Sequence, residues 1–187
     1  WLIFILLGLP FSLIPFVIDP AKIIEGATIR WDLFPWGFIA VLVIAGILAY
    51  FFLSGYLVRI YRGTKPAPDF TGWAALFIDG IKLNIVMLGW FLPGIILMLS
   101  VLLVALGGLI RPGMHATMGS TLTILVSILV LSLIAIGLFI IGALYAIPGA
   151  VRFSRTGSIR EGWRFEALTG IIRRIGWGNY LIALVVF

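Results

Sequence analysis

The sequence predicts an all-α protein, a polytopic bundle of transmembrane helices. Of its 187 residues, 63% are hydrophobic and only 11% are charged, whereas about a quarter of the residues in soluble domains are charged. The apolar residues form runs long enough to cross a bilayer, and the charged residues lie between these runs. No water-soluble core could enclose this much apolar surface, so we expect lipid to surround most of the chain.

Five apolar runs define the expected spans, at about residues 1–18, 36–58, 83–106, 121–147 and 179–187. A helix needs about 20 apolar residues to cross the hydrocarbon core. The first four runs therefore predict four full spans, and the last predicts a truncated fifth. We interpret residues 1–187 as one integral membrane domain and as a fragment at both ends, because the chain begins and ends inside apolar runs.

Glycine and proline interrupt the third expected span and follow the fourth. Gly89, Pro93 and Gly94 lie near the middle of the third span and predict a kink or a local break in the helix. Transporters use such breaks to direct backbone groups at a substrate, although proline kinks are also common in ordinary membrane helices. Directly after the fourth span, Pro148 and Gly149 predict the end of the helix.

An apolar stripe follows the first proline-rich loop. Trp73, Leu76, Phe77 and Ile81 share one helical face, and Asp79 lies on the opposite face. This pattern predicts an amphipathic helix in the membrane interface. The alternative is that these residues form the first turns of the third span.

The second basic loop predicts two helices. Ser158 and Glu161 have the spacing of a capping box, which predicts a helix start. A second amphipathic helix is expected over residues 166–175, with an apolar stripe at positions 168, 171, 172 and 175. Gly176 would end this helix.

Ten of the 13 basic residues lie in two loops, 59–82 and 149–178. The positive-inside rule places these loops, with their amphipathic segments, in the cytoplasm and the protein in the cell membrane as a multi-pass protein. We expect arginines of these loops to contact anionic lipid headgroups of the cytoplasmic leaflet; the alternative is that they only set the topology. The expected lipid-contact residues are Arg59, Arg62, Arg152, Arg155, Arg173 and Arg174.

The residue inventory predicts no catalytic, cofactor-binding or metal site. The chain has no cysteine and a single histidine, His115, so neither a thiolate nucleophile nor a histidine-rich metal site is expected. The net charge of +6 is assigned to the membrane interface rather than to nucleic acid, because the basic residues lie between apolar runs. All charged residues lie in loops or at span ends, which argues against a proton-coupled pump.

Two stretches of the chain resemble each other. The segment 58–62, VRIYR, is similar to 151–155, VRFSR, and the spacing of Trp73 and Gly80 is repeated by Trp163 and Gly170. This pattern predicts a parallel internal repeat, 55–106 and 142–187, related by an axis along the membrane normal. Chance similarity between two interface loops is the alternative.

The first basic loop also resembles a known family. The sequence GYLVRIYRG over residues 55–63, followed by PxPDFxxWxxLFxDGxK over residues 66–82, is similar to the signature loop of the largely archaeal membrane family called domain of unknown function 4013. Residues 148–165 resemble the second cytoplasmic loop of this family, whereas the charged loop 19–35 departs from it. The resemblance implies a helical protein of roughly six spans. It implies no established activity and transfers no functional residue.

These observations favour a non-enzymatic membrane module, either a scaffold or a protein that contacts lipid or a partner subunit. The alternative is a permease or transporter subunit, which the glycine- and proline-interrupted third span and the predicted repeat would support.

Overall fold

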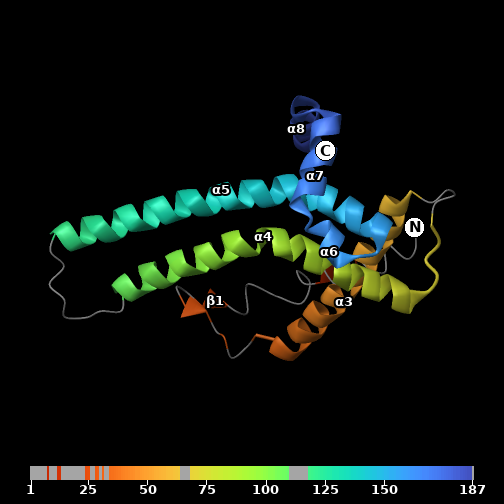
Figure 1. Ribbon diagram of the computed structural model, residues 1–187. Coiled ribbons are helices and arrows are strands. Elements are labelled where there is room, and N and C mark those ends of the chain that lie inside the picture. The colour runs from red at the N-terminus through yellow and green to blue at the C-terminus, as the bar shows by residue number, and fades with distance from the viewer. Residues whose placement is uncertain are drawn as a thin grey trace. The chain divides into compact units, whose positions relative to one another are not determined.

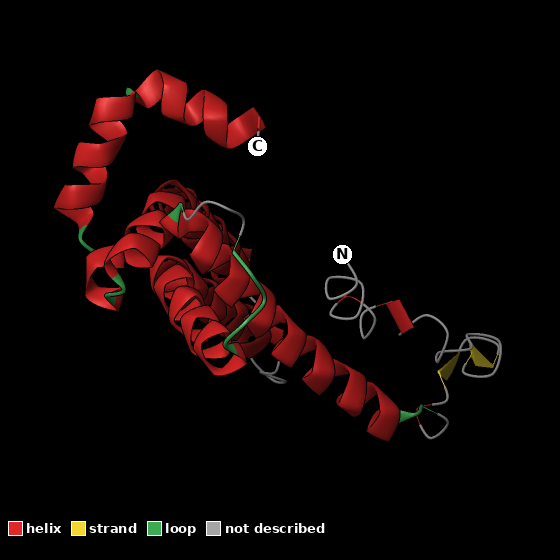
Figure 2. Cartoon of the chain, turned by 90° about the vertical axis from the view of Figure 1, so that its right-hand side faces the viewer, coloured by secondary structure: helices red, strands yellow, loops and turns green. Residues whose placement is uncertain are grey.

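The computed structural model describes residues 8, 12–13, 24–25, 28–29, 31, 34–63, 68–109 and 118–186. Helices dominate this part of the chain, and two antiparallel strands of two residues each precede them (Figures 1 and 2). The elements are β1 (Ile24–Glu25), β2 (Thr28–Ile29), α3 (Trp36–Arg62), α4 (Trp73–Leu109), α5 (Met118–Thr156), α6 (Ile159–Gly162), α7 (Phe165–Ile175) and α8 (Trp177–Val186). The chain forms two compact units, residues 1–81 and 82–187, which are described separately.

Among the described residues, three helices are long and apolar enough to cross a membrane: α3, α4 and α5. They contain the expected spans 36–58, 83–106 and 121–147, which confirms these three. The remaining part of the prediction, a first full span and a truncated fifth, is not shown. The expected span 1–18 lies outside the described residues except for three positions, and α8, with ten residues, is shorter than a crossing requires.

The spanning helices are longer than predicted at their basic ends. α4 begins at Trp73, so the predicted amphipathic segment is the first part of this helix rather than a separate interfacial helix. α4 also continues through Pro93, and its ribbon curves along its length (Figure 1). α5 continues past Pro148 and Gly149 to Thr156, so the prediction that these residues end the fourth span is wrong.

A distant tyrosine explains how α5 accommodates Pro148. Proline has no backbone N–H, so the carbonyl four residues earlier, that of Leu144, loses its helical hydrogen bond. The hydroxyl of Tyr180 in α8 donates a hydrogen bond of 2.6 Å to this carbonyl. Membrane helices tolerate proline where a neighbouring group satisfies the freed carbonyl.

In the first unit, α3 and the first turns of α4 cross at glycines. A Cβ atom on Gly55 would lie 1.8 Å from the Leu76 carbonyl oxygen, and one on Gly80 would lie 1.9 Å from the Phe51 carbonyl oxygen. Only glycine allows two backbones to approach this closely. Val58 and Leu76 are fully buried beside the crossing.

In the second unit, two tryptophans hold α6. The indole N–H of Trp90 in α4 donates to the Gly162 carbonyl at 3.1 Å, and the indole N–H of Trp163 donates to the Val86 carbonyl at 2.9 Å. On the α5 side, a Cβ atom on Gly149 would lie 2.6 Å from the same Gly162 carbonyl oxygen. The short helix α6 is therefore fixed by α4 and α5 at once.

The helix predicted over residues 166–175 is confirmed as α7, and Gly176 ends it with a φ of 88°. Three positions of its apolar stripe lie against protein: Leu168 and Ile172 are fully buried in a cluster with Tyr145 of α5 and Tyr180 of α8, and Ile171 packs against this cluster, whereas Ile175 is exposed. The amphipathic pattern of this helix thus reflects packing within the second unit.

Candidate lipid-contact site

Two of the predicted lipid-contact arginines are bound within the first unit. The Arg59 guanidinium donates to the carbonyl of Asp69 at 2.7 Å and to that of Gly72 at 3.5 Å. Arg62, in the last turn of α3, forms an ion pair of 2.8 Å with Asp79. Both side chains fasten the end of α3 to the segment that leads into α4 and to its first turns.

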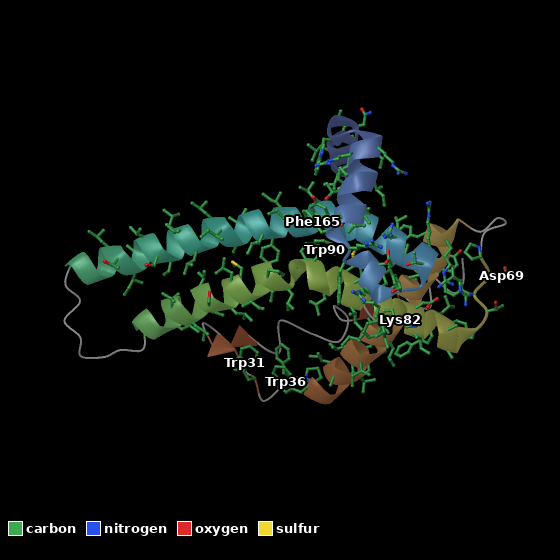
Figure 3. All side chains as sticks on the ribbon, viewed as in Figure 1. Trp31, Trp36, Asp69, Lys82, Trp90 and Phe165 are labelled. Atoms are coloured by element: carbon green, nitrogen blue, oxygen red, sulfur yellow. The ribbon has the colours of Figure 1, made fainter. Side chains whose placement is uncertain are left out.

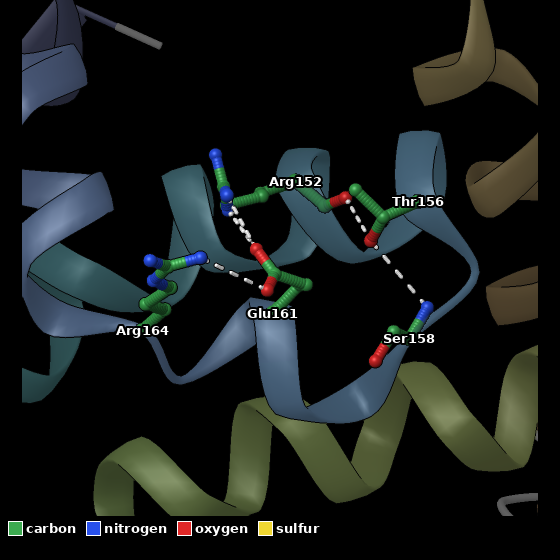
Figure 4. A network of polar contacts seen from close by, with 5 residues as sticks. All are labelled: Arg152, Thr156, Ser158, Glu161 and Arg164. Carbon is green, nitrogen blue, oxygen red and sulfur yellow. Dashed lines mark hydrogen bonds and ion pairs between the residues drawn. The ribbon is translucent and has the colours of Figure 1, made fainter.

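Arg152 is bound in a similar way in the second unit. Its Nε donates to Oε2 of Glu161 at 2.9 Å, and its Nη2 contacts the same oxygen. Arg164 approaches the other carboxylate oxygen, Oε1, at 3.4 Å, so that one carboxylate lies between two guanidinium groups (Figure 4). The hydrogen bond from Arg152 holds the pKa of Glu161 below its ordinary value, so this carboxylate is ionised at neutral pH.

The bond to Arg152 changes the local structure predicted for Glu161. The capping box required its carboxylate to return to the backbone N–H of Ser158. Instead Ser158 begins α6 without a side-chain cap, and α6 has only four residues. The predicted helix start is confirmed, and the predicted capping interaction is absent because Glu161 is engaged by Arg152.

The other three predicted arginines are exposed. Arg155 lies in the last turn of α5, and Arg173 and Arg174 lie in the last turn of α7. None of the three side chains forms an ion pair or a hydrogen bond with another described residue. A cation at a helix C-terminus is favoured by the helix dipole, and an exposed one remains available to an external anion.

Exposed aromatic side chains lie close in sequence to these three arginines, in the second unit. Trp163, Phe165 and Trp177 are 42%, 53% and 40% exposed. Phe165 stacks on Tyr145 at 4.6 Å between ring centroids, and Tyr145 stacks on Trp90 at 5.2 Å. Phe165 and Trp90, the two outer members of this stack, are labelled in Figure 3. Exposed tryptophans beside arginines are typical of the headgroup region of a membrane.

The predicted span-break residues lie in packed contacts. A Cβ atom on Gly89 would lie 2.5 Å from the indole of Trp163, and one on Gly94 would lie 3.2 Å from the ring of Phe139. Pro93 lies inside the continuous helix α4. Among the described residues, the absence of a side chain at Gly89 and Gly94 lets the rings of Trp163 and Phe139 pack close to the backbone of α4.

Sequence reasoning missed the contribution of Arg160, Glu161 and Arg164 to this face. A hollow of about 550 Å³ lies beside α6 and is lined by these three residues and Trp163. The alternation of arginines with one glutamate over residues 160–164 was a visible signal. Their convergence depends on the end of α5 and on the turn before α6, which the sequence pattern does not specify. No group of three or more potential metal ligands occurs among the described residues.

These features indicate a multi-span helical membrane protein with one strongly basic, aromatic end on its second unit. The chain belongs to the family described as "Protein of unknown function (DUF4013)", whose match covers residues 38–187. This match confirms the suspected family and covers nearly all of α3 to α8. No curated protein and no solved structure matches the chain.

Proposed function

We propose that this protein is a non-enzymatic membrane module that holds acidic lipid headgroups at the cytoplasmic face through Arg155, Arg173 and Arg174. The observation that carries the proposal is the division of the six predicted arginines. Arg59, Arg62 and Arg152 are bound by groups of the chain itself, whereas these three are exposed at helix ends.

The physical effect is electrostatic attraction to an anionic leaflet. Each arginine near such a surface contributes about 1 kcal/mol, which corresponds to roughly a fivefold preference per residue. Trp177 and Phe165, exposed on the same stretch, supply the interfacial contacts that keep these arginines at headgroup depth.

Packing around the third span supports this proposal over the transporter alternative. A transporter with a broken span would present backbone groups to a cavity near the middle of the bilayer. The glycines that flank Pro93 instead approach the rings of Trp163 and Phe139. A packed, aromatic contact of this kind favours a scaffold.

The test is the lipid selectivity of the full chain in nanodiscs. Spin-labelled phosphatidylglycerol and phosphatidylcholine report which lipid is immobilised at the protein surface. The variant R155Q/R173Q/R174Q is expected to lose most of the preference for phosphatidylglycerol.

The matched control is K22Q/R30Q/R111Q, which removes three positive charges from the two loops expected on the opposite side. This variant is expected to keep the preference. Equal loss in both variants, or no loss in the first, would overturn the proposal.

A further inference from the structure

The hollow beside α6 is built on a fixed frame. Its lining residues Arg160, Glu161, Trp163 and Arg164 belong to a single short stretch. This stretch is held by the Trp90 and Trp163 indole hydrogen bonds and by the close approach of Gly149 and Gly162. Binding groups on a rigid frame do not have to be ordered when a ligand arrives, which favours affinity.

The charge at this hollow is not balanced. Arg160 and Arg164 line it with two positive charges, and Glu161 lines it with one negative charge, which is already paired with Arg152 and remains ionised because of that bond. Arg160 is exposed, and its side chain forms no ion pair with a described residue. Arg164 is 60% exposed, and its contact with Glu161 is long, at 3.4 Å. An anion in the hollow would therefore find two guanidinium groups able to turn towards it.

Trp163 gives the hollow an apolar wall. Its indole N–H is occupied by the Val86 carbonyl, so its exposed ring surface can offer only apolar and π contacts to a ligand. Two guanidinium groups beside one aromatic surface match a ligand that has a phosphate next to a hydrocarbon portion.

We propose that this hollow binds one phospholipid, with the headgroup phosphate between Arg160 and Arg164 and the glycerol and first acyl carbons on Trp163. The inference rests on the proposed function in placing this face at the membrane surface. The proposed function requires only a general preference for acidic lipid, whereas this inference assigns one site that holds one lipid molecule.

The test is native mass spectrometry of the full chain in detergent, titrated with phosphatidic acid and, in a parallel arm, with inorganic phosphate. We expect one saturable phosphatidic acid adduct. R160Q/R164Q is expected to weaken this adduct tenfold or more. R173Q/R174Q, which also removes two exposed arginines, is expected to leave it within about twofold, because these residues do not line the hollow.

Three outcomes would overturn this inference: no saturable adduct, equal weakening by both double variants, or binding of inorganic phosphate as tight as that of the lipid. The last would indicate a site for free phosphate without the Trp163 contact. An unchanged thermal midpoint of R160Q/R164Q would show that the loss is not a folding defect, and R160K/R164K should restore part of the binding. If R155Q/R173Q/R174Q loses the preference for phosphatidylglycerol in nanodiscs but keeps the single phosphatidic acid adduct, the two proposals describe separate sites.

Discussion

The two units end their long helices in similar ways and continue differently. In each, a glycine is followed eight residues later by a glycine with positive φ: Gly55 and Gly63 in the first unit, Gly149 and Gly157 in the second. After this turn in the first unit, the next helix is α4, which begins at Trp73 and whose first turns belong to that unit. The second passes through three separate helices, α6, α7 and α8.

The first arginine of each similar segment also reaches forward, but to a different kind of partner. Arg59 binds the backbone carbonyls of Asp69 and Gly72, and Arg152 binds the carboxylate of Glu161. Counted from the packed glycine, these arginines are four and three residues away, and one residue rotates a side chain by about 100° around a helix. Similar helix ends thus lead to different structures. In the first unit the arginine fastens the chain beside the crossing of α3 and α4, and in the second unit it binds a glutamate beside exposed arginines.

The repeat predicted from the sequence is only partly reflected in local structure. Trp73 begins a helix, whereas Trp163 follows the end of α6. Gly80 meets the backbone of α3, whereas a Cβ atom on Gly170 would meet nothing within 4 Å. The repeat 55–106 and 142–187 therefore stays a prediction.

The largest effect is expected at the two glycines that the repeat aligns. Gly80→Ala would place a methyl group 1.9 Å from the Phe51 carbonyl oxygen and should destabilise the first unit by about 3 kcal/mol. Gly170→Ala meets no atom and should stabilise α7 by about 0.5–1 kcal/mol, as alanine does in helix interiors. Unfolding in detergent, followed by tryptophan fluorescence, measures both. Similar effects of the two variants would contradict the difference in packing between Gly80 and Gly170.

An intermediate effect is expected at the proline of α5. Tyr180→Phe leaves the Leu144 carbonyl without its hydrogen bond and should cost about 1–2 kcal/mol. In the background of Pro148→Ala, which restores the helical N–H, the same change should cost clearly less. A double-mutant cycle of unfolding free energies measures this coupling, and equal costs in both backgrounds would show that the tyrosine does not compensate for the proline.

The smallest effect is expected at the contact between Arg152 and Glu161, and this effect depends on pH. Arg152→Gln should lower the thermal midpoint by about 1–3 °C at pH 7, whereas Arg155→Gln, in the next turn of α5, should leave it unchanged. Because its folded pKa is lowered, Glu161 contributes stability that is complete above the ordinary glutamate pKa and is lost as the pH falls through the lowered value.

The midpoints of the wild type and R152Q should therefore converge on acidification below about pH 4. Midpoints measured from pH 7 to pH 3 test this expectation. A constant difference over this range would mean that Arg152 acts through packing alone.

The sequence predicted what depends on local pattern. Apolar runs located the three spanning helices, and the stripe ending at Gly176 located α7 to within one residue at its start. It failed where a distant group changed the local outcome. Pro148 did not end α5 because Tyr180 satisfies the freed carbonyl of Leu144, which lies 36 residues before it in the chain.

The candidate site shows the same limit. Charge counting identified the basic loops, but it could not separate Arg152, which binds Glu161, from Arg155, which is exposed. That separation depends on the direction in which each side chain leaves the last turns of α5. Where the chain turns after a helix is set by tertiary contacts rather than by periodicity.

The hydrogen bonds of Trp90 and Trp163 also constrain the order of assembly during synthesis. The Gly162 carbonyl receives a bond from α4 and lies against Gly149 of α5, yet it belongs to a segment that leaves the ribosome after both helices. Until that segment emerges, α4 and α5 lack the contacts that α6 makes with each of them at this end. The contacts made by the two tryptophans and by Gly149 can therefore form only after α4 and α5 have both been synthesised.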